Sequence, residues 1–89
     1  MNSYLTDDFL DHFAQLPENV KRLARKNYRL WKQDHSHPSL HFKPVHRGEG
    51  IYSVRIGRDW RALGLCEDDN IYWFWIGSHA DYDKLLAQL

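Results

Sequence analysis

The spacing of apolar residues changes near residue 38, and this change limits the folds that the chain can adopt. Before it, apolar residues recur every three or four positions, as on one face of a helix, and from Ser39 onward the period is two. The 89 residues suffice for one domain with one modest core. We therefore predict a single domain over residues 1–89 of the α+β class. An N-terminal helical hairpin should pack on one face of an antiparallel β-sheet meander, followed by a short C-terminal helix.

Two helices are predicted before the change of period. Thr6 can cap the first, which extends to Leu16 and has acidic residues in its first turn. Pro17 ends this helix and can occupy the first turn of the second, which runs from about Glu18 to Gln33. Because a single proline joins them, we expect the two helices to form an antiparallel hairpin.

Four strands and a last helix are predicted after the change. The strands are residues 39–45, 51–56, 60–66 and 71–76, and Pro44 favours an edge position for the first because proline cannot donate to a ladder. The aromatic run at residues 72–75 indicates a central strand buried on both sides, with a stacking platform for nucleotides as the alternative. Ser78 can cap the C-terminal helix, with Asp81 in the capping-box position.

Charge and composition exclude several kinds of protein. Twelve Lys and Arg residues balance twelve Asp and Glu residues, which argues against binding of nucleic acid through bulk charge. Cys66 is the single cysteine, which excludes an internal disulfide and a multi-cysteine metal site, and the histidines between residues 35 and 46 lack a metal-ligand spacing. No apolar stretch approaches the length of a membrane span, and the first residues do not resemble a signal peptide. We predict a cytoplasmic protein without a metal, a cofactor or a membrane contact.

The turn at residues 57–59 determines which residues face each other on the two strands that it joins. If the turn has three residues, Ile56 lies opposite Trp60 and Arg55 lies opposite Arg61. Opposed residues point to the same side of a sheet, so the two arginines should share the face away from the helices. Like charges in this arrangement destabilise a sheet. Either the two side chains splay apart in water, or they hold an anion such as a phosphate, which paired guanidinium groups can bind in a bidentate way.

The sequence resembles the RelE/ParE toxin superfamily in several segments. Residues 52–61 contain an aromatic residue, a short strand with an arginine, a turn, and then an aromatic residue followed by arginine. Residues 71–79 contain a final hydrophobic strand, a glycine and a histidine at the corner, with a tyrosine nearby. The inter-helix joint at residues 16–20 and the lysine-containing segment at residues 40–44 are also similar, so the resemblance covers nearly the whole chain.

This resemblance implies the toxin of a type II toxin–antitoxin system, which a small antitoxin protein silences. RelE-like members cut messenger RNA in the decoding site of the ribosome, whereas ParE-like members lack RNase activity and poison DNA gyrase. We expect a ribosome-dependent mRNA endonuclease that inhibits translation. The alternatives are a ParE-like gyrase inhibitor and a non-toxic partner-binding domain of the same fold. The basic residues between 21 and 32 are then a solvated helix face, a contact with ribosomal RNA or a contact with an acidic antitoxin.

The resemblance also implies roles for individual residues. Arg61 matches the catalytic arginine of the family and would hold the scissile phosphate, and Arg55 matches a second basic position on the preceding strand. His79 falls where relatives carry arginine or histidine, and its imidazole can act as an acid or a base. Tyr82 is the candidate for the C-terminal tyrosine of the family. Lys43 would neutralise a neighbouring phosphate.

Arg58 in the turn and His46 complete the predicted substrate-binding residues. Two structural alternatives stay open, in which His79 only hydrogen-bonds a helix end and Tyr82 only packs beneath the last helix. The sequence also departs from the family: its net charge is zero, and Glu49 lies in a comparable loop but matches no motif for an acidic general base. These departures favour ParE-like activity or weakened catalysis.

Overall fold

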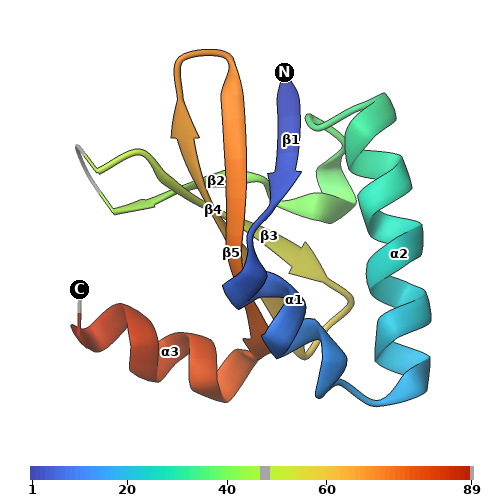
Figure 1. The fold of residues 1–89 in the computed structure, drawn as a ribbon. Coiled ribbons are helices and arrows are strands. Elements are labelled where there is room, and N and C mark those ends of the chain that lie inside the picture. The colour runs from blue at the N-terminus through green and yellow to red at the C-terminus, as the bar shows by residue number, and fades with distance from the viewer. Residues whose placement is uncertain (47–48, 89) are drawn as a thin grey trace.

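The computed structural model describes residues 1–46 and 49–88, except for the side chain of His46, and forms one mixed sheet flanked by helices (Figure 1). Along these residues the elements are β1 (Asn2–Leu5), α1 (Asp7–Ala14), α2 (Glu18–Gln33), the 3₁₀ helix η1 (Pro38–Leu40), β2 (Lys43–His46), β3 (Ile51–Ile56), β4 (Trp60–Glu67), β5 (Asn70–Ser78) and α3 (His79–Gln88). The α+β class and the order of helices, meander and C-terminal helix are as predicted.

The sheet differs from the predicted meander at one edge. Its strand order is β1-β5-β4-β3-β2, and β2 to β5 are antiparallel as predicted, but β1 pairs in parallel with β5. The predicted antiparallel meander is therefore confirmed over β2 to β5, and β1 is a parallel edge strand that the sequence did not predict. Four residues are too few to show a period, and three of the four are exposed, so the sequence of β1 carries no strand pattern.

The two N-terminal helices follow the predicted pattern closely. The hydroxyl of Thr6 accepts a hydrogen bond from the Phe9 amide at 3.2 Å, which caps α1. α1 ends at Ala14 rather than Leu16, because the chain tightens there into i→i−3 hydrogen bonds ahead of Pro17. α2 has the predicted bounds and turns back along α1 (Figure 1).

The predicted strand at residues 39–45 is wrong in its first half. The chain forms η1 there and enters β2 only at Lys43. His37 accepts a hydrogen bond from the Ser39 amide at 3.2 Å, and such local capping competes with strand pairing. The bend also buries Leu40 completely, and the predicted loop at residues 46–50 lies partly outside the described residues.

The later strands are confirmed, with β4 and β5 longer than predicted. Their pairing shifts between Leu63 and Gly64, which leaves Phe74 as an extra residue in β5. Of the aromatic run, Trp73 is buried and packs edge-on against Trp31 with ring centroids 5.4 Å apart. The other three aromatic residues of the run are half-buried, so β5 is central without being buried on both sides throughout.

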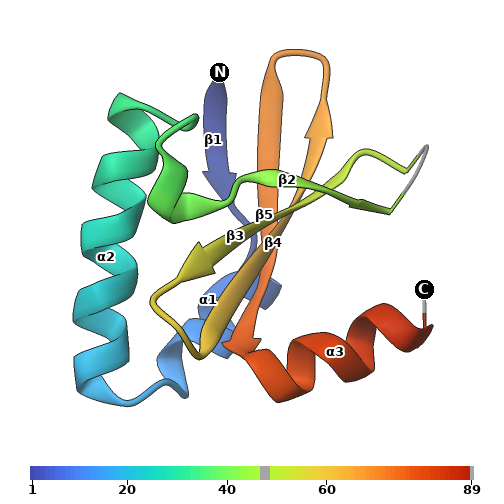
Figure 2. The same ribbon diagram turned by 180° about the vertical axis from the view of Figure 1, so that it is seen from behind.

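The helices α1 and α2 cover one face of the sheet. The other face, which we call the open face because α1 and α2 do not cover it, has α3 beside it and is buried at Ser53 and Leu63. Figure 2 shows this open face from behind, with α1 on the far side of the sheet. The core lies between the helices and the covered face, where Val54, Ile56 and Ala62 are buried. Because neighbouring residues of a strand point to opposite faces, Arg55 and Arg61 must lie on the open face.

Candidate functional site

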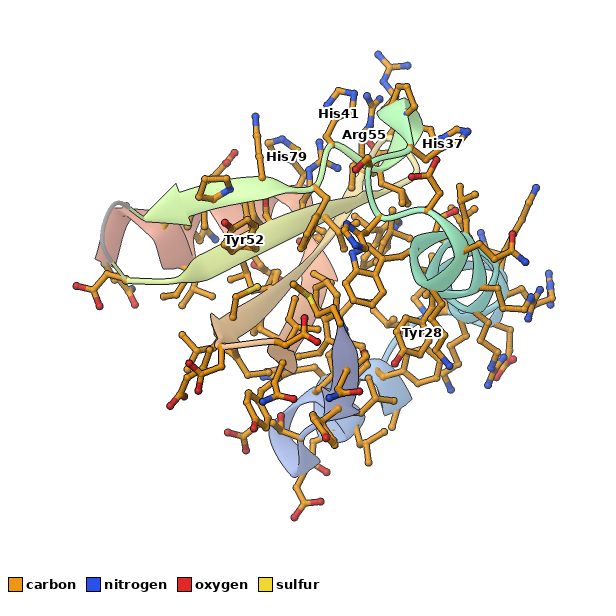
Figure 3. The ribbon with its side chains drawn as sticks, turned by 90° about the horizontal axis from the view of Figure 1, so that it is seen from above. Tyr28, His37, His41, Tyr52, Arg55 and His79 are labelled. Atoms are coloured by element: carbon orange, nitrogen blue, oxygen red, sulfur yellow. The ribbon has the colours of Figure 1, made fainter. Side chains whose placement is uncertain are left out.

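The two arginines of the β3–β4 hairpin lie as the turn predicts. Arg55 pairs with Arg61, and Ile56 pairs with Trp60. The side chains of a strand alternate between faces, so the burial of Val54 and Ile56 under the helices places Arg55 on the open face. Figure 3 shows Arg55 on the side of the sheet away from α1. Both arginines are half-buried.

Each arginine is held by carbonyls in or next to the turn between them. Nε of Arg55 donates to the carbonyl of Gly57 at 3.0 Å, and Nη1 of Arg61 donates to the carbonyls of Arg58 at 3.2 Å and Trp60 at 2.7 Å. A guanidinium group has five N–H donors, so each still has donors for an anion. The turn thus fixes the position of both charges before any ligand arrives.

The electrostatics of Arg61 reflect this crowding of positive charge. Partial burial, and then the charge of Arg55, lower the pKa of the Arg61 guanidinium, while Tyr82, Asp83 and Asp59 raise it. The group stays charged because arginine is not deprotonated in proteins. Two cations therefore share a partly desolvated surface, and an anion bound between them would relieve their repulsion.

His79 is the first residue of α3 and is hydrogen-bonded to the β3–β4 hairpin. Its backbone amide donates to the carbonyl of Asp59 at 2.7 Å, which fastens the start of α3 to the β3–β4 turn. Its Nδ1 lies 3.0 Å from Oδ2 of Asp83, one helical turn further on. The predicted cap of α3 is confirmed, because the Asp81 amide donates to the Ser78 hydroxyl at 3.1 Å. The carboxylate holds the imidazole in one orientation.

Tyr82 joins this group from beneath α3. It is buried, and its ring lies edge-on to the His79 ring with centroids 5.9 Å apart and 6.5 Å from the Trp75 ring. It is close enough to Arg61 to affect the pKa of that group. The structure therefore brings together all four residues that the sequence suggested for catalysis, namely Arg55, Arg61, His79 and Tyr82.

The predicted substrate-binding residues lie further out. Lys43 is exposed on β2 and pairs with Ser53, which lies two residues before Arg55 on the same face. Arg58 is exposed in the turn, where its carbonyl accepts the hydrogen bond from Arg61. The backbone of His46 pairs with Ile51, and its side chain lies outside the described residues.

Asp83 is a site residue that the sequence reasoning missed. Its signal was available, because a carboxylate four residues after a histidine on a helix lies on the same face as that histidine. Within the described residues, no group of three or more His, Cys, Asp or Glu side chains is arranged to hold a metal ion. No helix among those residues is long and apolar enough to cross a membrane.

Comparisons with known proteins give a family and a fold. The family described as "ParE-like toxin domain" matches residues 18–84. No curated protein matches the sequence. Among solved structures, the RelB–RelE antitoxin–toxin complex of Methanococcus jannaschii matches with a TM-score of 0.73 and 12% identity, over 92% of this chain and 96% of that one.

Two further structures have the same fold. The RelBE2 toxin–antitoxin complex of Mycobacterium tuberculosis has a TM-score of 0.70 and 18% identity, over 90% of this chain and 92% of that one. The isolated RelE toxin of Escherichia coli has a TM-score of 0.65 and 10% identity, over 99% of this chain and 98% of that one. Because the family match spans most of the sequence and the fold agrees with it, this chain belongs to the family of ParE-like toxin domains, within the RelE/ParE toxin superfamily.

Proposed function

We propose that this toxin domain is a ribosome-dependent mRNA endonuclease that inhibits translation until an antitoxin binds it. The observation that carries the proposal is the Arg55–Arg61 pair on the open face, with His79 and Tyr82 beside it. RNA cleavage of this kind requires cations for the phosphate and a group that transfers protons, and both are present in one place.

The chemistry assigned to these residues needs no metal. The ribose 2′-hydroxyl attacks the adjacent phosphorus, and the two guanidinium groups hold the phosphate and stabilise the charge that develops on it. When Nδ1 of His79 donates to Asp83, its Nε2 is left to exchange a proton with the reacting oxygens. Tyr82 supports the imidazole from the side.

An antitoxin is the proposed partner, and two features of the described residues support it. An apolar crevice of about 190 Å³ lies between α1, α2 and the covered face of the sheet, with the exposed side chains of Leu5 and Leu10 among its lining. β2 is an edge strand that can accept an added strand. The structural neighbours from M. jannaschii and M. tuberculosis are themselves complexes of a toxin with an antitoxin.

The test is to induce the protein without its antitoxin and map mRNA 5′ ends. We expect new ends inside translated codons within minutes, and none in cells that express an Arg61→Ala variant. Growth at the normal rate with intact mRNA would contradict the proposal and favour a non-toxic partner-binding domain.

A gyrase inhibitor is the second candidate. The family that matches the chain is named after ParE, and the net charge is zero, which suits a protein-binding toxin better than one that binds ribosomal RNA. In this case induction should cause a DNA-damage response and leave mRNA intact. Arg61→Ala should then have little effect, because no phosphate is cut.

A further inference from the structure

The crevice on the covered face of the sheet is lined almost entirely by apolar side chains. Its volume is about 190 Å³, and its walls are α1, α2, the end of β1 and the covered face of β3, β4 and β5. An apolar cavity of about 150 Å³ inside a protein stays dry and binds benzene. The crevice is therefore large enough for one small ring or a short alkyl chain.

Aromatic rings contribute much of the lining. The rings of Phe9 and Phe13 on α1 lie nearly parallel, with centroids 6.3 Å apart. Trp31 of α2 packs edge-on against Trp73 of β5 with centroids 5.4 Å apart. All four side chains line the crevice. An aromatic ligand can pack against such rings edge-on or offset-stacked, which adds to the energy of burial.

Apart from the tryptophans, the lining has three polar side chains, and two of them already have partners. Nδ2 of Asn27 donates to the carbonyl of Arg55 at 3.4 Å. The hydroxyl of Tyr28, which points from α2 toward β1 (Figure 3), lies 2.6 Å from the Ser3 hydroxyl. The third polar side chain is Arg25, so a ligand that enters the crevice meets one polar group whose charge is still available.

Arg25 stands at the mouth of the crevice. Its Cζ lies 5.2 Å from the centroid of the Phe13 ring, a cation–π contact that holds the guanidinium beside the apolar lining. The side chain is exposed and makes no ion pair with any residue whose placement is described. Arg22 and Arg29 are exposed one helical turn away on either side, and no acidic side chain lines the crevice. The group that suits this mouth is therefore an anion.

We propose that the crevice binds a small carboxylate whose body is an apolar ring or a short alkyl chain. The body enters between α1, α2 and the sheet, and the carboxylate stays at the mouth beside Arg25. Burial of the body supplies most of the binding energy, and the ion pair with Arg25 adds a preference for an anion. An inorganic anion has no apolar body and should not bind here.

This site is separate from the arginine pair. Val54 and Ile56 line the crevice, and Arg55 between them points to the open face. The inference therefore goes beyond the proposed function and does not depend on whether the protein cuts mRNA. The crevice is also where we place the antitoxin, so ligand binding is measured on the purified chain without its antitoxin.

The test uses hydrocinnamate and hydrocinnamyl alcohol, two probes that share an apolar body and differ in charge. We expect hydrocinnamate to shift the NMR signals of the Trp31 and Trp73 indole N–H groups in a titration that saturates. The signals of Trp60 and Trp75, which lie outside the lining, should stay in place. A titration that does not saturate, or one that moves only the signals of Trp60 and Trp75, would overturn the proposal.

Arg25→Gln isolates the effect of the charge. It should weaken the binding of hydrocinnamate about 2–5-fold, as expected for one exposed ion pair, and leave the binding of the alcohol unchanged. Arg22→Gln is the matched control, because it removes a charge from the same helix at a residue outside the lining, and its effect should be smaller. Equal losses in the two variants would indicate general attraction to α2 and would contradict a site at Arg25.

Ala24→Leu tests where the apolar body lies. Ala24 is buried in the wall of the crevice, so leucine there should fill part of the volume and weaken both probes by about tenfold or more. Leucine is a good helix former, and thermal melting checks that the variant is folded. A folded Ala24→Leu protein that binds both probes as the parent does overturns the proposal. If this variant unfolds, the comparison of Arg25→Gln with Arg22→Gln decides.

Discussion

Two guanidinium groups face each other across the β3–β4 hairpin, which a sheet built for stability alone would avoid. Their N–H groups donate to the carbonyls of Gly57 and Arg58 in the turn, and these hydrogen bonds hold both side chains close to the sheet. At the scale of single residues, the molecule therefore keeps an unfavourable pair of charges ready for an anion. A substitution at either arginine can therefore change activity without lowering stability.

Replacing Arg61 with alanine should remove activity and leave the fold intact. The developing charge on the phosphate loses a fixed cation, for which a loss of about 10²–10³-fold in cleavage rate is typical. Stability should change little, because relief of the repulsion with Arg55 offsets the two lost hydrogen bonds to the turn. Arg61→Lys should recover part of the rate, since it restores the charge but not the bidentate fork.

Thermal melting and antitoxin binding of both Arg61 variants are the controls. An Arg61→Ala protein that stays as toxic as the parent would contradict the phosphate-binding assignment. If the Arg61→Ala protein is harmless because it has unfolded, the loss of toxicity is not evidence for phosphate binding. Thermal melting detects that case.

Cys66 should be a poorly reactive thiol whose effect on stability appears only at alkaline pH. Burial raises the pKa of the Cys66 thiol, so the folded chain keeps its proton at pH values where the unfolded chain has lost it. The free energy of unfolding should therefore be unaffected near neutral pH and decrease as the pH rises above the ordinary thiol pKa of about 8.5. Urea titrations of the parent and of Cys66→Ala at neutral and alkaline pH measure this, and an equal pH dependence in the two proteins would refute it.

At the scale of elements, β1 is held by side chains as well as by its backbone. The Ser3 hydroxyl accepts a hydrogen bond from Nε1 of buried Trp73 at 3.0 Å and lies 2.6 Å from the Tyr28 hydroxyl. These two contacts link β1 to β5 and to α2. The N-terminal strand is therefore part of the packed structure although most of its residues are exposed.

Ser3→Ala should lower the free energy of unfolding by about 1–3 kcal/mol, because it leaves the Trp73 indole N–H buried without an acceptor. Urea denaturation measures the change. Ser36→Ala is the matched control, since Ser36 is exposed, and it should shift stability by less than about 0.5 kcal/mol. Equal effects of the two substitutions would show that the Ser3 contact does not stabilise the fold.

Much of this element-level structure could be predicted from the sequence. The helical period, the cap at Thr6 and the three-residue turn gave both N-terminal helices and the register of the central hairpin, because each rests on local geometry. β1 and η1 could not be predicted, since they depend on contacts with residues far away in the chain: β1 needs residues 70–73, and η1 needs a core that buries Leu40. For the site, the register predicted the arginine pair, but the hydrogen bonds that hold both guanidinium groups to nearby carbonyls depend on side-chain conformations that no local pattern indicates.

At the scale of the whole molecule, the two faces of the sheet have separate uses in our proposals. The apolar crevice lies under α1 and α2 on the covered face, with Val54 and Ala62 in its lining. Arg55 and Arg61 lie on the open face. Antitoxin binding at the crevice and catalysis at the arginines should therefore respond to different substitutions.

Leu10→Asp should weaken the antitoxin complex and leave toxicity intact. Leu10 is 47% exposed at the crevice, so a carboxylate there is compatible with the fold but unfavourable in an apolar interface. Co-purification with the antitoxin and growth on co-expression are the measurements. A Leu10→Asp protein that the antitoxin binds and silences as well as the parent would show that the crevice is not part of the interface.

The parallel pairing of β1 with β5 also sets when the molecule can be completed during its own synthesis. β1 is translated first, but the residues that it pairs with lie in the last quarter of the chain, and so does Gly77, the partner of Arg61. Closing so long a loop is slow compared with local helix formation. A chain that is still being translated therefore lacks both the finished sheet and the pairing of Arg61 with Gly77, and neither can form until synthesis is nearly over.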